Sequence, residues 1–434
     1  MLPAVRTSRG PVLLILSSAF LAAAANGISM VAFPWLVLQR TGSATDASVV
    51  AAAATLPLLV ATLVAGTAVD FLGRRRVAML SDAMSAASVA AIPLLVATHG
   101  IGALTTVVLA ALAAAGSFFD PGGMTARMSM LPEAARRANW TLDHTNSMYE
   151  AVFNLAYITG PGIGGLLIAT IGGVNTMWIT AAAFGASILT MAILRLPGTG
   201  RPERSEQPEG VVSGVVEGLK FVWHNKVLRT LGLIDLSVTA LYLPMESVLF
   251  PKYFTDRNEP AHLGWVLMAL SIGGLVGALS WTVLSRFVSR RATVLTAVLT
   301  FGTASLIISV LPPLPMILAL CAVVGLVYGP IGPIYNSVMQ ARTPENMRGR
   351  VVGVMTSMTY SAGPVGFMLA GPMIDAFGLS ATFLVLAVPI LLIGLAAPWI
   401  PALRELDDGG ELDDGGELDD GGELDQAPAV GSLD

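Results

Sequence analysis

The sequence predicts an all-α membrane protein of twelve transmembrane helices, arranged as two pseudo-symmetric six-helix halves. Of 434 residues, 54% are hydrophobic and 12% are charged, which is about half the charged share of an average soluble domain. The apolar residues gather in blocks of about 20, the length at which a helix crosses a hydrocarbon core. A pattern of Pro121, Pro132, Glu133 and Arg136 recurs about 212 residues later, and such internal duplication is typical of secondary transporters.

Each apolar block is expected to be helical, because no backbone polar group can stay unpaired in lipid. The twelve expected spans are, in order, residues 11–36, 48–69, 77–98, 103–125, 146–169, 176–196, 229–251, 262–284, 292–312, 315–339, 351–374 and 380–400.

The positions of the basic residues predict the orientation in the membrane. With twelve spans, only Arg40, Lys252 and Arg257 of the 24 Lys and Arg residues fall on the side away from the termini. Basic residues concentrate in cytoplasmic loops. We therefore expect a multi-pass protein of the cell inner (cytoplasmic) membrane with both termini in the cytoplasm.

Four regions follow from this pattern. Residues 1–196 form the N-terminal half, 197–228 a polar cytoplasmic linker, 229–400 the C-terminal half, and 401–434 an acidic tail. Apolar residues between Val211 and Trp223 recur at helical intervals, which predicts an amphipathic surface helix in the linker.

The tail contains a Glu-Leu-Asp-Asp-Gly-Gly repeat, and residues 405–434 hold twelve of the 29 acidic residues. This composition predicts disorder. Truncation after Arg404 is therefore expected to leave transport intact, although a docking role for the tail stays open.

No feature of the sequence suggests an enzyme or a cofactor. Cys321 is the sole cysteine and the four His residues are scattered, so we expect no metal site. A phosphate-binding Gly-x-x-x-x-Gly-Lys loop is absent, which argues against direct use of ATP. Nucleic acid is not an expected partner, and the protein is expected to act as a monomer.

A charged turn follows the second span. It contains Gly66, Asp70, Gly73, Arg74 and Arg75. Asp70 can accept hydrogen bonds from a neighbouring helix N-terminus and pair with an arginine of the turn. We expect this turn to act as a cytoplasmic gate that holds one conformational state.

Proline and glycine interrupt the fifth span at Gly160, Pro161, Gly164 and Gly165. Proline bends a helix and close-set glycines let a neighbour approach. The segment suits a gate between the halves, with ordinary helix packing as the alternative.

The candidate acids within the expected spans are Asp120, Glu150, Asp235 and Glu246. A charge at mid-membrane costs roughly 3 kcal/mol, so each acid should face protein or water. Carboxyls in a low dielectric can bind a proton near neutral pH, which makes these residues candidates for proton coupling. Glu150, Asp235 and Glu246 could instead lie near the headgroups, and Asp120 is expected to pair with Arg127 on the same helix face.

Other residues of the spans could line a roomy apolar cavity with a few polar groups, as expected of a site for small-molecule drugs. The candidates are Asn26, Met30, Phe33, Asn154, Tyr242, Tyr335 and Tyr360.

These motifs resemble those of the major facilitator superfamily. The Gly66–Arg75 turn resembles its motif A, with Phe71 where a basic residue is common, and residues 160–165 resemble the antiporter motif. The segments 32–40, 244–254 and 348–355 look like those of Tap-type multidrug efflux pumps. The resemblance implies a drug:proton antiporter that exports tetracycline, aminoglycosides or spectinomycin by alternating access, yet Asn26 stands where many drug exporters carry an acid.

Two other functions remain open. A metabolite importer or uniporter would share the fold, and would move its substrate downhill without a proton response. A lipid-handling or signalling membrane protein would not require the acids within the spans.

Overall fold

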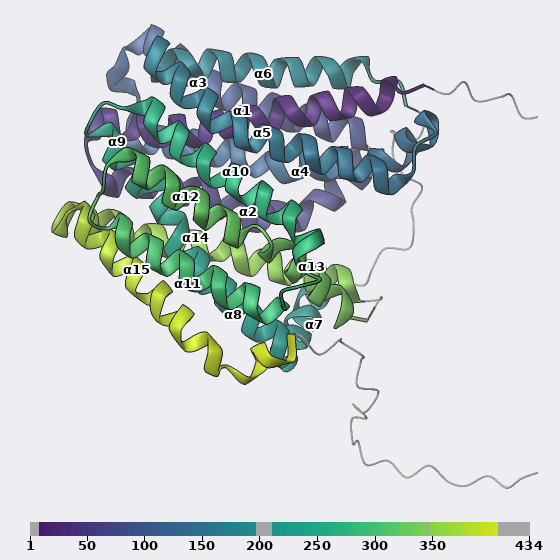
Figure 1. Cartoon of the computed structure of the whole chain (residues 1–434). Coiled ribbons are helices and arrows are strands. Elements are labelled where there is room, and N and C mark those ends of the chain that lie inside the picture. Colours follow the sequence, from purple (N-terminus) through teal and green to yellow (C-terminus); the bar gives the residue numbers. More distant parts are fainter. Residues whose placement is uncertain (1–7, 197–210, 345–346, 407–434) are drawn as a thin grey trace, which may run out of the picture.

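The computed structural model describes residues 8–196, 211–344 and 347–406, which fold into long helices joined by short turns (Figure 1). The first group of helices comprises α1 (Gly10–Thr41), α2 (Ala44–Leu72), α3 (Arg74–His99), the 3₁₀ turn η1 (Ile101–Ala103), α4 (Thr106–Ala138), α5 (Leu142–Ile171) and α6 (Gly173–Ile193).

The second group follows helix α7 (Val211–His224), which lies where the linker helix was expected. It comprises α8 (Lys226–Pro244), the π-turn η2 (Met245–Leu249), α9 (Phe250–Thr255), α10 (Pro260–Leu284), α11 (Arg290–Ile308), α12 (Leu314–Tyr328), α13 (Ile331–Ala341), α14 (Arg348–Phe377), α15 (Leu379–Ala396) and the 3₁₀ turns η4 (Ala397–Trp399) and η5 (Pro401–Leu406).

Polar residues and glycines define the helix ends. The hydroxyls of Ser43, Thr105 and Thr141 accept hydrogen bonds from the first turns of α2, α4 and α5. Such side chains satisfy amide groups that have no partner within the helix. Gly73 has a φ of 91° and separates α2 from α3, a conformation that glycine adopts without strain.

Eleven helical segments in the described part of the chain are long and apolar enough to cross a membrane. The segment expected as the eleventh of twelve spans is α14, which has 30 residues but contains Pro364, Pro372 and several hydroxyl side chains. Two expected spans are interrupted. The seventh passes through the π-turn η2, and the tenth breaks between α12 and α13 at Gly329 and Pro330.

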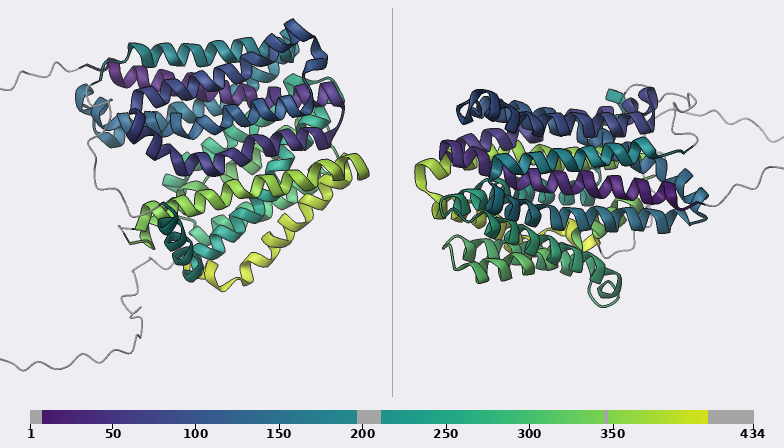
Figure 2. Two further views of the ribbon diagram at one scale, coloured as in Figure 1. Left: turned by 180° about the vertical axis from the view of Figure 1, so that it is seen from behind. Right: turned by 90° about the horizontal axis from the view of Figure 1, so that it is seen from above.

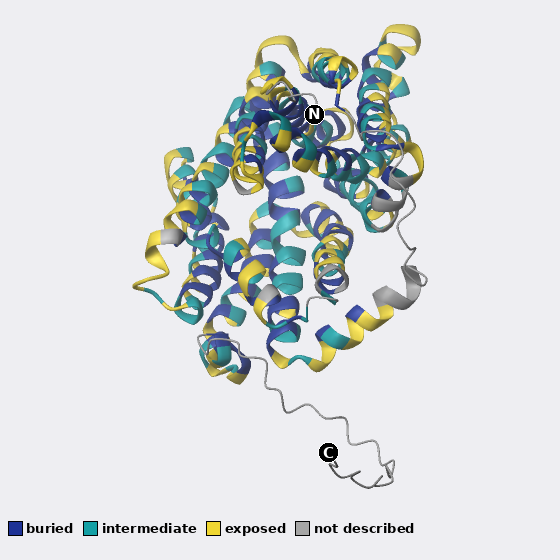
Figure 3. Cartoon of the chain, turned by 90° about the vertical axis from the view of Figure 1, so that its right-hand side faces the viewer, coloured by how far each residue is buried: buried dark blue, intermediate teal, exposed yellow. Residues whose placement is uncertain are grey.

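The helices run roughly parallel to one long axis (Figure 2). Helix α1 begins at Gly10 at one end of the bundle, which we call the proximal end. It stops at Thr41 at the opposite end, which we call the distal end. Helices α1–α6 pack mainly on one another, as do α8 and α10–α15. The pairs α2–α14 and α5–α10 join the two groups, and much of the periphery is exposed in the view onto the proximal end (Figure 3).

Regular structure extends beyond residue 400, where composition predicted that the disordered tail begins. Residues 401–406, expected to begin the disordered tail, form η5, in which Ala402, Leu403 and Leu406 are buried. Glu405 is held by Arg342, which donates to its backbone oxygen at 2.5 Å and lies 3.8 Å from its carboxylate. The rest of the expected tail, from residue 407, lies outside the described residues.

Candidate functional site

Asp120 of α4 is half-buried and has polar partners on two neighbouring helices. The Ser85 hydroxyl of α3 donates to the Asp120 carboxylate at 3.0 Å, and the Asn26 side chain of α1 is a second hydrogen-bond partner. The expected pairing of Asp120 with Arg127 is therefore wrong. Asp120 is satisfied by neutral groups, and the arginine has a more deeply buried partner.

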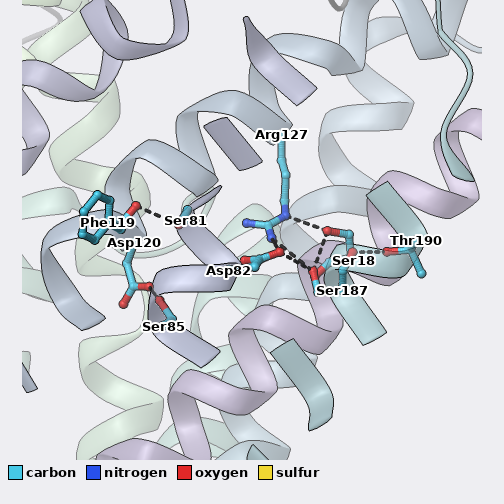
Figure 4. A network of polar contacts seen from close by, with 9 residues as sticks. All are labelled: Ser18, Ser81, Asp82, Ser85, Phe119, Asp120, Arg127, Ser187 and Thr190. Carbon is cyan, nitrogen blue, oxygen red and sulfur yellow. Dashed lines mark hydrogen bonds and ion pairs between the residues drawn. The ribbon is translucent and has the colours of Figure 1, made fainter. Parts of the chain in front are cut away.

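That partner is Asp82 of α3, and the two side chains are only 5% and 3% exposed (Figure 4). The Arg127 Nε donates to the Ser18 hydroxyl at 2.9 Å, and the Ser187 hydroxyl donates to Asp82 at 2.7 Å. The four residues come from α4, α3, α1 and α6. A buried charge pair needs such added hydrogen bonds to offset the loss of water.

Asp82 was not among the expected site residues, although α3 carries a signal for a polar face. Ser81, Ser85 and Ser88 recur at helical spacing and donate to backbone carbonyl oxygens of α4 at 2.8, 3.4 and 2.9 Å. All three are buried. A charged residue inside this serine stripe is therefore enclosed between helices, where it needs a partner.

Glu246 lies in the π-turn η2, directly after α8 ends at Pro244. Its side chain is buried, with 6% of the residue exposed. Tyr242, one turn earlier, is its hydrogen-bond partner, and Cys321 and Tyr157 lie within electrostatic range. Single π-turns within helices are frequent at functional sites, and an enclosed carboxyl of this kind can take up and release a proton.

Two tyrosines connect the surroundings of Glu246 and Asp120 across the boundary between the groups. Tyr157 of α5 lies within electrostatic range of Glu246 and of Tyr360 of α14, and Tyr360 lies within range of Asp120. Tyr157 and Tyr360 are 42% and 37% exposed, and each lies within electrostatic range of an acid of the opposite group. The two acids therefore belong to one polar region between the groups, which includes Tyr157, a residue not expected from the sequence.

Asp235 has different surroundings from Glu246, although both lie on the expected seventh span. It accepts a hydrogen bond of 2.6 Å from the Thr359 hydroxyl of α14. Tyr335, expected in the cavity, donates to the backbone oxygen of Leu231 at 2.5 Å. That hydroxyl is thus engaged in fixing α13 to α8.

The remaining expected residues are more scattered. Glu150 and Asn154 are exposed on α5, and the Asn154 amide donates to the Glu150 backbone oxygen at 2.8 Å rather than to its carboxylate. Met30 lies 3.8 Å from the Tyr157 hydroxyl, measured to its sulfur. Phe33 packs against the hydrophobic core.

The glycines of α5 divide between two faces of the helix. A methyl group built on Gly160 would lie 2.9 Å from the Gly27 Cα of α1, and one on Gly164 would lie 3.1 Å from the Ile28 Cα. These contacts stay within the first group. They allow α1 and α5 to approach more closely than larger residues would permit.

The other face of α5 contacts the second group. A methyl group on Gly165 would lie 2.6 Å from the Pro260 backbone oxygen of α10, and one on Gly162 would overlap Met268. Because α5 ends and α10 begins at the distal end, these glycines close that end of the boundary. Gly162 was not among the expected motif residues.

The turn between α2 and α3 is only partly described. Arg75 donates from Nε to the Met191 oxygen at 2.8 Å and also to the Ala192 oxygen, so it binds the last carbonyls of α6. The Arg74 Nε is buried and has no hydrogen-bond partner within the described residues. The side chains at positions 66 and 70, including the expected acid of the gate, lie outside them.

Within the described residues, no group of three or more His, Cys, Asp or Glu side chains could hold a metal ion. The polar region around Glu246 and Asp120 offers their two carboxyls, tyrosine hydroxyls and the Asn26 amide. Such groups can bind protons and polar parts of a ligand.

Comparison with known proteins places these features in a family. The family model described as Major Facilitator Superfamily matches residues 15–367 and 246–413. The chain is 67% identical over 401 residues to the multidrug efflux pump Tap of Mycolicibacterium fortuitum, covering 92% of this chain and 98% of that protein. It is 63% identical to the protein of the same name from Mycobacterium tuberculosis H37Rv, with 92% and 96% covered.

Solved structures agree in fold. The nucleoside transporter NupG superposes with a TM-score of 0.71 over 90% of this chain and 98% of that one, at 13% sequence identity. At that identity the likeness concerns the arrangement of helices alone. The family match and the similarity to the two efflux pumps together show that the chain belongs to the Major Facilitator Superfamily.

Proposed function

We propose that the protein exports small-molecule drugs across the cytoplasmic membrane in exchange for protons, by alternating access between two six-helix halves. The observation that carries the proposal is the identity of 63–67%, over more than nine tenths of each chain, to proteins named multidrug efflux pumps. Tetracycline, aminoglycosides and spectinomycin are the proposed substrates. Helix α14 is the proposed eleventh of twelve spans, both termini lie in the cytoplasm, and the protein acts as a monomer.

The proposed orientation makes the distal end the outer end. In the structure this end is closed by the α5–α10 and α2–α14 contacts, which involve Gly165 and Gly371. A drug-binding site between the two groups would then open towards the cytoplasm and receive drug from that side. An exporter must expose its site to both sides in turn, with only one side open at a time.

Glu246 and Asp120 are the proposed proton-binding acids. Glu246 is enclosed at an irregular helix turn, and Asp120 lies within electrostatic range of Tyr360 of the other group. A proton gained or lost at either acid changes the charge at the boundary where the two halves must separate. Asp235, held by Thr359, and Glu150, which is exposed, are assigned the secondary roles of cavity acids.

The cytoplasmic gate is proposed to use Asp70 with Arg74. The buried Arg74 Nε without a described partner supports this choice over Arg75, which is engaged by α6. Asp70→Asn removes the charge with little change of shape. The variant should insert normally and transport poorly, whereas unchanged transport would limit this turn to a role in topology.

Drug uptake into inverted membrane vesicles tests the proposed function. Tetracycline should accumulate when the vesicle interior is acidic and should leave when an ionophore collapses the pH gradient. Glu246→Gln should abolish accumulation while binding of the drug persists, and Glu133→Gln, which alters the proximal ion pair with Arg136, should accumulate the drug normally. Accumulation that ignores the imposed gradient would contradict proton exchange.

A further inference from the structure

The carboxylate of Asp375, at the distal end of α14, binds the first turn of α2 in the other group. Its Oδ1 accepts from the Ala44 amide at 3.0 Å, and its Oδ2 from the Thr45 amide at 2.9 Å and the Ser43 hydroxyl at 3.3 Å. More than 300 residues of chain separate the partners. These contacts therefore hold only while α14 lies against α2.

The N-terminus of α2 is capped from two sources. Ser43, its own cap residue, accepts from the Asp46 amide at 3.1 Å, whereas the amides of Ala44 and Thr45 are satisfied by Asp375. The first amides of a helix lack partners within the helix and carry partial positive charge. A carboxylate is thus well matched to this position, and its hydrogen bonds are charge-assisted.

The backbone next to Asp375 is shaped for the same contact. A methyl group on Gly371, one turn earlier in α14, would lie 2.5 Å from the Ser48 hydroxyl and 2.7 Å from the Thr45 Cα. Further along, a methyl group on Gly363 would lie 3.1 Å from the Thr55 side chain. Helices α2 and α14 therefore meet without an intervening side chain, which brings Asp375 within reach of the α2 amides.

We propose that Asp375 is a positioning residue of transport that holds the outer gate closed until the two halves rotate apart. The proposal rests on the proposed function and adds the residue that determines how readily the outer end opens. Opening breaks three hydrogen bonds at once and leaves the α2 amides to water. The carboxylate thereby favours the state in which the site faces the cytoplasm and loads drug.

The ionisation of Asp375 suits a group that holds the outer gate closed, which we call the latch, rather than a proton carrier. It lies just beyond the apolar segment 351–374, at the distal surface. Burial by itself would raise the pKa of this carboxyl, but hydrogen bonds from Thr45, Ala44 and Ser43 outweigh burial and hold the pKa below its usual value. The carboxylate therefore stays charged near neutral pH while Glu246 and Asp120 are left to exchange protons.

Cysteine accessibility in the full-length protein measures the gate directly. The native Cys321 is replaced by alanine in a background first shown to reach the membrane at the normal level, and Ser48→Cys introduces a thiol at a position that is 3% exposed in the closed contact. A membrane-impermeant maleimide added outside should label this thiol slowly. Asp375→Ala should speed labelling by roughly tenfold, the effect of a shift of about 1.4 kcal/mol in the gate equilibrium, and Asp375→Asn, which keeps an acceptor oxygen, should fall between.

Two controls separate gating from folding. Asp256→Asn removes an acid that is paired with Lys252 in its own group, also at the distal end, and should leave labelling unchanged. Gly353→Cys, in the proximal half of α14 where a methyl group meets nothing within 4 Å, should label more slowly from the cytoplasmic side once Asp375 is lost. A general loss of packing would speed labelling at both positions.

Unchanged labelling of Ser48→Cys in Asp375→Ala, or faster labelling at both ends, would overturn the latch. The test does not depend on which substrate is carried. If labelling changes as expected but vesicles take up no tetracycline, the latch stands and the proposed substrate is wrong. If vesicles accumulate tetracycline and labelling does not respond to Asp375, the latch is wrong and the proposed export stands.

Discussion

At the scale of single residues, the charges buried among the helices have different partners and different tasks. Arg127 and Asp82 neutralise each other inside the first group with help from Ser18 and Ser187. Among the described residues, the hydrogen-bond partner of Glu246 is Tyr242. The paired residues suit a rigid role within the first group, whereas the carboxyl without a cation suits proton exchange.

The pair Asp82–Arg127 predicts a strong effect on stability. Asp82→Asn or Arg127→Gln leaves one buried charge uncompensated and should lower the free energy of unfolding by about 3–5 kcal/mol. The double variant should lose less than the sum of the two, because no lone charge remains. Thermal unfolding in detergent measures this, with Arg136→Gln, whose side chain is 77% exposed, as a control of little effect. Additive losses would argue against a direct pairing.

The sequence predicts which charged residues lie within the spans, but it does not predict which residues they contact. The acids within the spans are evident from composition, since a charge in an apolar block needs a reason to be there. Their partners come from other helices: Asp82 for Arg127, Ser85 for Asp120 and Thr359 for Asp235. Helical spacing within α4 predicted that Asp120 pairs with Arg127. That prediction was wrong because spacing within one helix does not show that α3 places Asp82 beside Arg127.

At the scale of helices, glycine decides which pairs come close. On α5, Gly160 faces α1 and Gly165 faces α10, so a single motif serves both packing within a group and contact between groups. Methyl groups on Gly273 and Gly277 of α10 would similarly overlap the α12 backbone, at the Ala322 oxygen and the Leu326 oxygen. Periodicity predicted the helices themselves, but which face of a glycine-rich helix meets which neighbour depends on the assembled bundle.

The two faces of α5 predict different effects of substitution. Gly165→Ala places a methyl group 2.6 Å from the Pro260 oxygen and should favour the outward-open state, seen as faster external labelling of Ser48→Cys. Gly160→Ala presses on α1 within the first group and should lower stability instead. Gly185→Ala, which meets nothing within 4 Å, is the matched control. Equal labelling in the Gly160 and Gly165 variants would contradict this division.

The end of the ordered chain predicts where the tail can be cut. Leu403 and Leu406 are buried and Glu405 is bound by Arg342, so truncation after Leu406 should leave insertion and efflux unchanged. Truncation after Arg404 removes Glu405 and Leu406 with their contacts and should lower thermal stability, although composition predicted that this cut has no effect. Protein level and melting temperature of the two truncations measure the difference, and identical values would show that η5 contributes little.

At the scale of the whole molecule, the structure has closed distal contacts and a polar region between its two groups of helices. Composition and duplication predicted the helical membrane fold, because lipid leaves few alternatives for apolar blocks of this length. They could not predict which end is closed, since that depends on contacts such as Asp375 with α2. The sequence also did not predict the π-turn that encloses Glu246, because Pro244 alone does not specify a π-turn.

Proton movement driven by the drug itself tests drug:proton exchange most directly. Purified protein in liposomes with a trapped pH-sensitive dye, and no initial pH gradient, receives tetracycline on one side. Downhill flow of the drug should drive protons in the opposite direction, and Glu246→Gln should still pass the drug but move no protons. Drug flow without any proton movement in the unaltered protein, or equal proton movement in Glu246→Gln, would contradict a proton exchange that depends on Glu246.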